Sequence, residues 1–257
     1  MNGVIHQDIA LADVVSGAVR IEAALVGSSE EGTVDELSKL LRSVLRMADQ
    51  GAYVTRAAAP RDAAFSIVNE QVGDFAIAWE CEARATDWRV AQIVRNVLVM
   101  FTQVHHPVSL FSIVSAERSA CRRTLPPLGG GPVDASYPGL SAAVRIPVVK
   151  SAPRKFKDGR RAVIEFVEPL SDQGLGRTIE LVETWGNASF GAYGSSEGEI
   201  WNGESAILDV TADVLDDWSV EVAIERFGAP EAAWASLINL AGRFDADIGR
   251  VAKVVIE

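Results

Sequence analysis

The residues that could do chemistry most directly form an acidic cluster in the C-terminal part of the chain. Six carboxylates fall within 17 positions, and no basic residue lies among them. They are Asp209, Asp213, Asp216, Asp217, Glu221 and Glu225. A surface of one sign accelerates association with an oppositely charged partner and disfavours partners of the same sign. The cluster therefore predicts a binding surface for a basic protein. The alternative is a solvated face whose edge-strand charges discourage aggregation.

Two of the six tryptophans could add an apolar anchor to such a surface. Trp88 is expected in the first turn of a helix, and Trp201 is expected in a hairpin turn. A partly exposed tryptophan is a common anchor in protein interfaces. We therefore take both as further candidates for partner binding. Periodicity places the other four in the core, namely Trp79, Trp185, Trp218 and Trp234.

Histidine and cysteine do not occur at catalytic or metal-binding spacings. His105 and His106 are adjacent, so they point in different directions, and no ligand residue lies at a suitable spacing beside them. Cys121 is followed by Arg122, whose charge favours a thiolate, but it has no nearby histidine. The sequence therefore predicts no catalytic residue, no metal ligand and no bound cofactor.

A glycine-rich stretch at residues 172–178 precedes a predicted helix, as an anion-binding site requires. It reads Asp-Gln-Gly-Leu-Gly-Arg-Thr and matches no complete phosphate-binding pattern. We interpret it as a turn, with Thr178 as the N-cap of the helix.

Charge is divided unevenly along the chain, which has a formal net charge of -11 at pH 7. Residues 116–161 hold ten basic and three acidic side chains, so this segment carries +7 and the remainder carries -18. Phosphate contacts depend on cations, and an overall negative field repels nucleic acid. The sequence therefore predicts no nucleic-acid partner, and it predicts a basic connector that lies near acidic residues of the same molecule.

Length and composition restrict the class of protein further. At 257 residues and 48% hydrophobic side chains, the chain can bury one large core or two smaller ones. No stretch is apolar for the roughly 20 residues that a membrane helix requires. Asp8 and Asp13 stand where a secretory signal would carry basic residues. We therefore expect a cytoplasmic protein with no membrane partner.

The elements that must position these residues repeat along the chain. In residues 75–82, large apolar side chains and cysteine alternate with alanine or glutamate, as in a half-buried strand, with Phe75, Ile77, Trp79 and Cys81 on the apolar face. Residues 219–225 repeat the alternation at an offset of 143, and a helix with an apolar stripe and a final strand follow in both places. Phe101 and Phe244 hold equivalent positions in the two helices, so both are expected in the core.

A strand and a helix are also expected at the start of each half. Residues 18–26 alternate as a strand, and His6 is expected in a tail before them. Thr33 with Glu36 predicts a capping box at the start of a helix that ends at Gly51.

Three strands are expected between the two helices of the first half. They are residues 52–57, 65–68 and 75–82, and Thr86 is expected to cap the second helix. The second half follows the same order of apolar positions.

The predicted fold is α+β, with two ferredoxin-like-type repeats. Each repeat has a strand, a helix, three strands, a helix and a strand, in a mostly antiparallel sheet with its helices on one face. Residues 18–115 form the first repeat, and residues 162–257 form the second. Residues 116–161 form a basic connector rich in proline and glycine, with a possible edge strand at 142–149. The two sheets could join at their edges, or the two halves could pack face to face.

The end of the chain resembles a known group of proteins. Residues 244–251 read Phe-Asp-Ala-Asp-Ile-Gly-Arg-Val, so an apolar helix ends in aromatic-Asp-x-Asp-apolar-Gly before a final strand. This is similar to the C-terminal end of α+β immunity proteins from bacterial polymorphic toxin systems. The resemblance implies an acidic protein that binds a toxin domain, often a nuclease.

These observations predict a non-enzymatic intracellular protein-binding protein, a toxin-immunity or inhibitor protein whose acidic surface contacts a basic partner. The alternative is a small-molecule-binding protein, or a cofactor-independent enzyme, with a pocket between the duplicated α+β halves.

Overall fold

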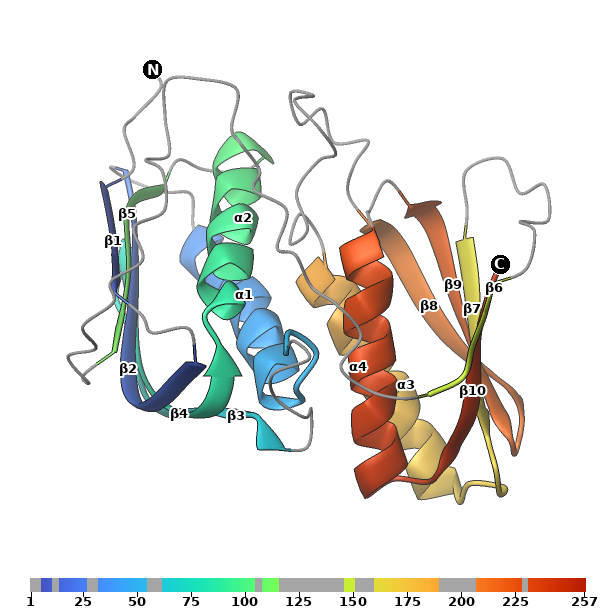
Figure 1. Ribbon diagram of the computed structural model, residues 1–257. Coiled ribbons are helices and arrows are strands. Elements are labelled where there is room, and N and C mark those ends of the chain that lie inside the picture. Colours follow the sequence, from blue (N-terminus) through green and yellow to red (C-terminus); the bar gives the residue numbers. More distant parts are fainter. Residues whose placement is uncertain are drawn as a thin grey trace.

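The computed structural model describes residues 6–10, 14–26, 32–54, 62–104, 108–115, 146–150, 160–189, 207–227 and 231–257. Within these ranges the chain is an α+β protein with two mostly antiparallel sheets and four helices (Figure 1). Each half of the chain contributes one sheet and two helices.

The first half forms a five-stranded sheet in the order β1-β5-β2-β4-β3. Its inner face is apolar because alternate residues of β2, such as Val19, Ile21 and Ala23, are buried. Neighbouring strands are antiparallel except β1 and β5, which are parallel. The elements are β1 (His6–Ala10), β2 (Val14–Leu25), α1 (Thr33–Asp49), β3 (Ala64–Val72), β4 (Ala76–Asp87), α2 (Arg89–Val104) and β5 (Val108–Ser115).

The second half forms a sheet in the order β6-β10-β7-β9-β8, which corresponds strand for strand to the first. Its short first strand, β6, again pairs in parallel with the last strand of the half. The elements are β6 (Val148–Lys150), β7 (Arg160–Phe166), α3 (Asp172–Ser189), β8 (Ile207–Asp216), β9 (Ser219–Phe227), α4 (Glu231–Asp247) and β10 (Val251–Ile256).

The strand order of the two sheets matches, as the predicted repeat requires, but the strand predicted at residues 52–57 was wrong. Among the described residues two strands, not three, lie between the helices of each half. Residues 52–54 form a turn after α1 instead of a strand, and residues 55–57 lie outside the described part. His6 begins a strand, not a tail, and β2 starts before residue 18. Of the edge strand predicted at residues 142–149, residues 142–145 lie outside the described part, and β6 after Pro147 is at the edge of its sheet as predicted.

Three predicted helix caps were also wrong, those at Thr33, Thr86 and Thr178. The N-cap of α1 is Gly32, with φ of 92° and no side-chain hydrogen bond, so Thr33 does not cap it. Thr86 belongs to β4 and donates its hydroxyl hydrogen to the Ala64 carbonyl at 2.8 Å. Asp87 caps α2 in its place, since its carboxylate accepts the Arg89 amide at 3.0 Å.

Thr178 is buried inside α3, not at its start. Its hydroxyl donates to the Gly174 carbonyl one turn earlier at 2.9 Å, so the glycine-rich stretch is already helical. Ser171 accepts the Gly174 amide at 3.2 Å and satisfies one free donor at the helix start.

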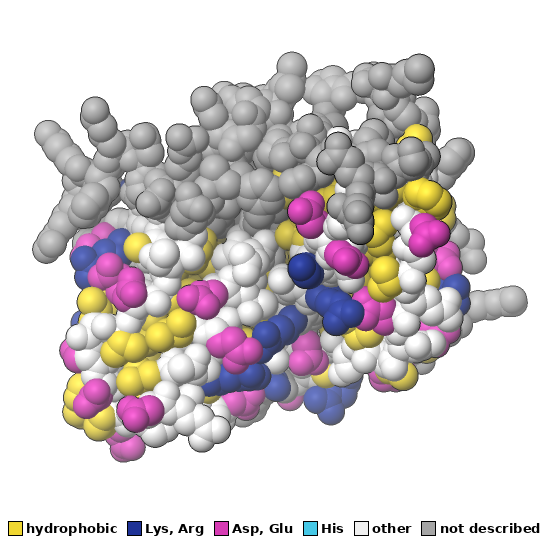
Figure 2. Space-filling model, turned by 180° about the vertical axis from the view of Figure 1, so that it is seen from behind, with side chains coloured by type: hydrophobic (Ala, Val, Ile, Leu, Met, Phe, Trp, Pro, Cys, Tyr) yellow, Lys and Arg dark blue, Asp and Glu magenta, His cyan; other side chains and the backbone are white. Residues whose placement is uncertain are grey.

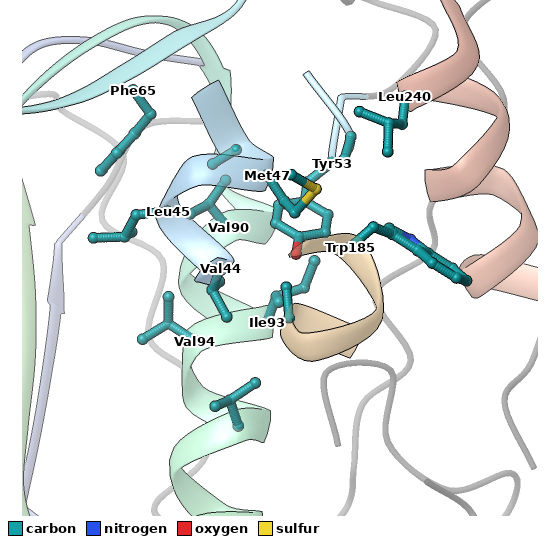
Figure 3. Close-up of a cluster of buried hydrophobic side chains, with 14 of the residues drawn as sticks. Val44, Leu45, Met47, Tyr53, Phe65, Val90, Ile93, Val94, Trp185 and Leu240 are labelled. Atoms are coloured by element: carbon teal, nitrogen blue, oxygen red, sulfur yellow. The ribbon is translucent and has the colours of Figure 1, made fainter. Parts of the chain in front are cut away.

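The two halves pack through their helices, so the molecule has the layer order sheet, helices, helices, sheet (Figure 1). Each pair of helices covers the inner face of its own sheet and meets the other pair on the opposite side. Figure 3 shows Met47, Tyr53 and Ile93 of the first half facing Trp185 and Leu240 of the second half. Of the two arrangements considered from the sequence, the halves therefore pack face to face, through their helices.

Buried residues of both sheets and all four helices belong to one continuous hydrophobic cluster. Phe101 and Phe244 have exposed fractions of 1% and 0%, which confirms their predicted burial. Trp79, Trp185 and Trp234 are buried as predicted. The indole N–H of Trp185 donates to the Ser236 hydroxyl at 2.8 Å, which joins α3 to α4.

Polar contacts also connect the two halves. Arg46 of α1 forms an ion pair with Glu180 of α3 at the surface. In the interior, the side-chain amide of Asn239 on α4 donates to the carbonyls of Ala52 and Val54, at 3.3 and 3.0 Å. These three residues are buried, so the carbonyls of the turn after α1 depend on Asn239 instead of water.

We expect the substitution Asn239→Ala to lower the free energy of unfolding by about 1–3 kcal/mol, because it leaves two buried carbonyls without a donor. Urea unfolding followed by circular dichroism measures this change. Asn187→Ala is the matched control, because Asn187 is exposed on α3 and its loss should change stability by less than about 0.5 kcal/mol. Equal effects of the two substitutions would contradict the bridging role of Asn239.

Candidate functional site

The candidate site lies where β8 turns into β9, and we call residues 213–218 the hairpin end. The carboxylate of Asp216 holds this turn together. It accepts the Trp218 amide at 2.9 Å and the Ser219 hydroxyl at 2.7 Å. An aspartate that binds the backbone two residues later is a common turn former. Asp216 therefore has a structural role in the loop that presents its neighbours.

The other members of the acidic cluster have different environments. Glu221 lies opposite Asp213 in the β8–β9 ladder, on the outer face of the sheet. Arg161 of β7 forms an ion pair with Glu221, which relieves the repulsion between the two carboxylates. Asp213 and Asp217 are exposed, and neither has an ion pair with another described residue.

Two members lie partly outside the described part of the chain. Asp209 belongs to β8 and Glu225 to β9, but their side chains lie outside the described part of the chain. The acidic cluster thus contains one ion pair, one turn former and two exposed carboxylates at the hairpin end.

Exposed apolar side chains accompany these acids. Val214, Leu215 and Trp218 have exposed fractions of 45%, 49% and 47%. Exposed Val167 adjoins them, because the amide of the preceding Phe166 donates to the Trp218 carbonyl at 2.8 Å. The second half lies on the left in Figure 2, where hydrophobic and acidic side chains alternate over its surface. Adjacent apolar residues exposed with a charged rim are typical of interaction sites.

The prediction that Trp218 lies in the core was wrong. It shares the odd–even parity of buried Val220, but residues 217–218 form the turn, where the alternation of the strand does not apply. Sequence reasoning also missed Leu215 and Val167. The available signal was a pair of large apolar residues, Leu215 and Trp218, flanking two aspartates between two strands.

The first half has an equivalent hairpin end with a different charge. Val72 and Phe75 are exposed by 48% and 46%, and the Phe75 carbonyl accepts the Leu25 amide at 2.8 Å, as Trp218 does with Phe166. Phe75 was predicted on the buried face, but it precedes the first residue of β4. Positions 70–79 contain two acidic residues, Glu70 and Asp74. Glu70 is ion-paired with Arg42. Only the second hairpin end therefore combines apolar exposure with several carboxylates.

The two tryptophans chosen from the sequence do not join this surface in the described part. Trp88 is half-buried against the hydrophobic core at the start of α2, and the Arg89 guanidinium lies 5.4 Å from the centre of its ring. Trp201 lies outside the described residues.

The described residues provide little reactive chemistry. Among them, no group of three or more His, Cys, Asp or Glu side chains could hold a metal ion. Cys81 is buried in β4, and burial raises the pKa of its thiol to about 12, which makes it a poor nucleophile. His105, His106 and Cys121 lie outside the described part. No helix in the described ranges is both long and apolar enough to span a bilayer.

Comparison with known proteins gives no family. No protein-family model matches the chain, and no curated protein matches its sequence. The periplasmic protease PqqL from Escherichia coli is 10% identical to this chain, with a TM-score of 0.24. The match covers 92% of this chain and 35% of PqqL, so this chain spans about a third of the length of PqqL. A dye-decolorizing peroxidase from Bacteroides thetaiotaomicron VPI-5482 is 11% identical with a TM-score of 0.20, over 100% of this chain and 96% of that one. Similarities this weak support no conclusion about fold or function.

The turn at Asp216 gives a prediction about pH. Hydrogen bonds from the Ser219 side chain and then from the Trp218 amide hold the pKa of Asp216 below its ordinary value of 3.8. A depressed folded-state pKa contributes stability above the unfolded pKa, and this stability is lost as pH falls through the folded value. We expect an NMR titration of the Asp216 carboxyl carbon to have its midpoint below 3.8. Ser219→Ala should shift the midpoint upward; an unchanged midpoint would contradict the assigned bond.

Proposed function

We propose that this protein binds a basic partner protein through the hairpin end of its second half and does not catalyse a reaction. We further propose that the chain is a tandem duplication of a ferredoxin-like unit, supported by the same strand order and the same added parallel strand in both sheets. In this view duplication created two hairpin ends, and only the second acquired the charge of a binding surface.

The observation that carries the proposal is that exposed apolar and acidic residues adjoin one another in a single turn. Leu215 and Trp218 present large apolar side chains, while Asp213 and Asp217 have no ion pair among the described residues. Interfaces commonly have an aromatic or aliphatic centre and a polar rim. Exposed carboxylates increase the rate of encounter with a basic surface and reject acidic ones.

The proposed partner class is a toxin domain with a basic surface, and the protein would then act as a cytoplasmic immunity protein. The resemblance of residues 244–251 to immunity proteins supports this class. In the structure this stretch ends α4 and starts β10: the Asp245 carboxylate accepts the Val251 amide at 2.8 Å. The motif therefore positions the last strand of the sheet, and its Arg250 carbonyl accepts the amide of Val167, which adjoins the hairpin end.

The alternative of an enzyme or small-molecule binder required a pocket between the two halves. Where the halves meet in Figure 3, apolar side chains such as Tyr53, Trp185 and Leu240 fill the space between the helices. No observation on the described residues favours the alternative over protein binding.

We expect immobilised wild-type protein to capture a basic protein from a lysate of the source organism. The double variant Asp213→Lys with Asp217→Lys should reduce capture at least about 10-fold, because it replaces attraction by repulsion. Trp218→Ala should reduce the affinity by about 30-fold, corresponding to an interface anchor of about 2 kcal/mol. Quantitative mass spectrometry of the captured proteins, followed by calorimetric titration of the purified partner, measures both effects.

The first half provides matched controls for Asp217→Lys and Trp218→Ala. Asp74→Lys and Phe75→Ala change the equivalent residues of the other hairpin end, and both should leave binding unchanged. If the variants of the second half retain the same basic protein as fully as these controls do, the proposed surface is wrong.

A further inference from the structure

One long strand edge adjoins the hairpin end. β8 has ten residues and is the last strand of the second sheet. In the described part of the chain it pairs with β9 on one side and with no strand on the other. Such an edge presents a row of backbone N–H and C=O groups that can pair with another chain.

Helix packing holds this edge in a fixed position. Gly186 of α3 lies directly against Val210 of β8, so close that a β-carbon at Gly186 would be 2.5 Å from the Val210 β-carbon. On the same inner face Ala212 is buried, which anchors the strand below its exposed end. The edge is therefore pre-formed for an added strand and loses little conformational freedom on binding.

The charge of the edge indicates what kind of strand fits it. The segment from β8 to the turn carries four aspartates, Asp209, Asp213, Asp216 and Asp217, and no basic residue. Pairing of β8 with β8 of a second copy would bring acidic strands together, which is unfavourable. β3 is the corresponding edge of the first sheet, and its only charged residue is Glu70. It therefore offers no basic side chain to β8 either. Neither of these two described edges supplies the cations, and the occupant whose charge complements the edge is a basic strand of a different protein.

We infer that the partner adds an extended basic segment to the free edge of β8 as a further strand of the sheet. This inference rests on the proposed function and specifies its mode of recognition: backbone hydrogen bonds supply affinity, and alternate side chains supply specificity. Basic side chains of the added strand lie beside Asp213 on the outer face, and apolar ones lie beside Ala212 and Val214 on the inner face. The recognised segment therefore alternates basic and apolar residues.

The test uses the intact protein and an eight-residue peptide of alternating Lys and Val, with both ends blocked. Hydrogen exchange measured by NMR reports each backbone amide separately. With the peptide in excess, we expect about 10-fold slower exchange of alternate amides in residues 210–216, because only every second amide faces the free edge. The amides of β3 should be unaffected, which makes this strand an internal control.

Two further peptides separate strand pairing from charge attraction. A peptide of alternating Lys and Pro has the same charge, but proline has no N–H and is excluded from ladders, so it should give no protection. A peptide of alternating Glu and Val can pair but is repelled, so it should not bind. Equal protection by the Lys-Val and Lys-Pro peptides, or no protection by the Lys-Val peptide, would overturn the inference.

The same measurement on the complex with the captured partner distinguishes this inference from the proposed function. If the partner loses affinity on Trp218→Ala while the β8 amides remain unprotected in the complex, the binding surface stands and strand addition is wrong. If the β8 amides are protected while the variants of the hairpin end bind as tightly as wild type, strand addition stands and the proposed surface is wrong.

Discussion

The arrangement of the whole molecule follows from helices that are buried on both sides. Residues 90–98 of α2 are buried one after another, so they cover the full circumference of the helix. A helix at the surface of a single sheet keeps a polar face toward water, whereas a helix that is buried all round needs a second layer. The helices of the other half supply that layer. Even polar residues of this region, such as Gln92 and Asn239, are buried there, and Asn239 binds backbone of the opposite half.

This constraint also determines where a partner can bind. The inner face of each sheet and both sides of the helix layers are occupied by the protein itself, so the outer faces, free edges and turns remain. On the outer face of the first sheet, Arg20 pairs with Glu22 and Glu80. On the second sheet, Arg161 and Lys253 pair with Glu221 and Glu165, which leaves the exposed acids at the hairpin end. The proposed surface combines exposed apolar side chains with carboxylates that have no ion pair among the described residues.

The periodicity of apolar residues predicted the strands and helices well, because it reflects the burial of one face of each element. The stripes containing Phe101 and Phe244 were read correctly, and so was the strand of Val220, Val222 and Ile224. The errors fell where side-chain hydrogen bonds and turns override the pattern. Thr86 and Thr178 were taken for caps, but each hydroxyl instead binds a nearby carbonyl. The candidate site was half predicted: the acids were visible as a cluster, whereas the exposure of Trp218 depends on the turn that Asp216 closes. The contact between the halves could not be predicted from local sequence patterns, because it joins residues almost 190 positions apart, such as Asn239 and Ala52.

The central claim is that the two sheets share one core through their helices and support the binding surface as a single cooperative unit. Differential scanning calorimetry of the intact chain tests this claim most directly. A shared core predicts one unfolding transition in which the calorimetric and van't Hoff enthalpies agree. Two separate transitions, each with its own enthalpy, would show that the halves fold independently and would contradict the account.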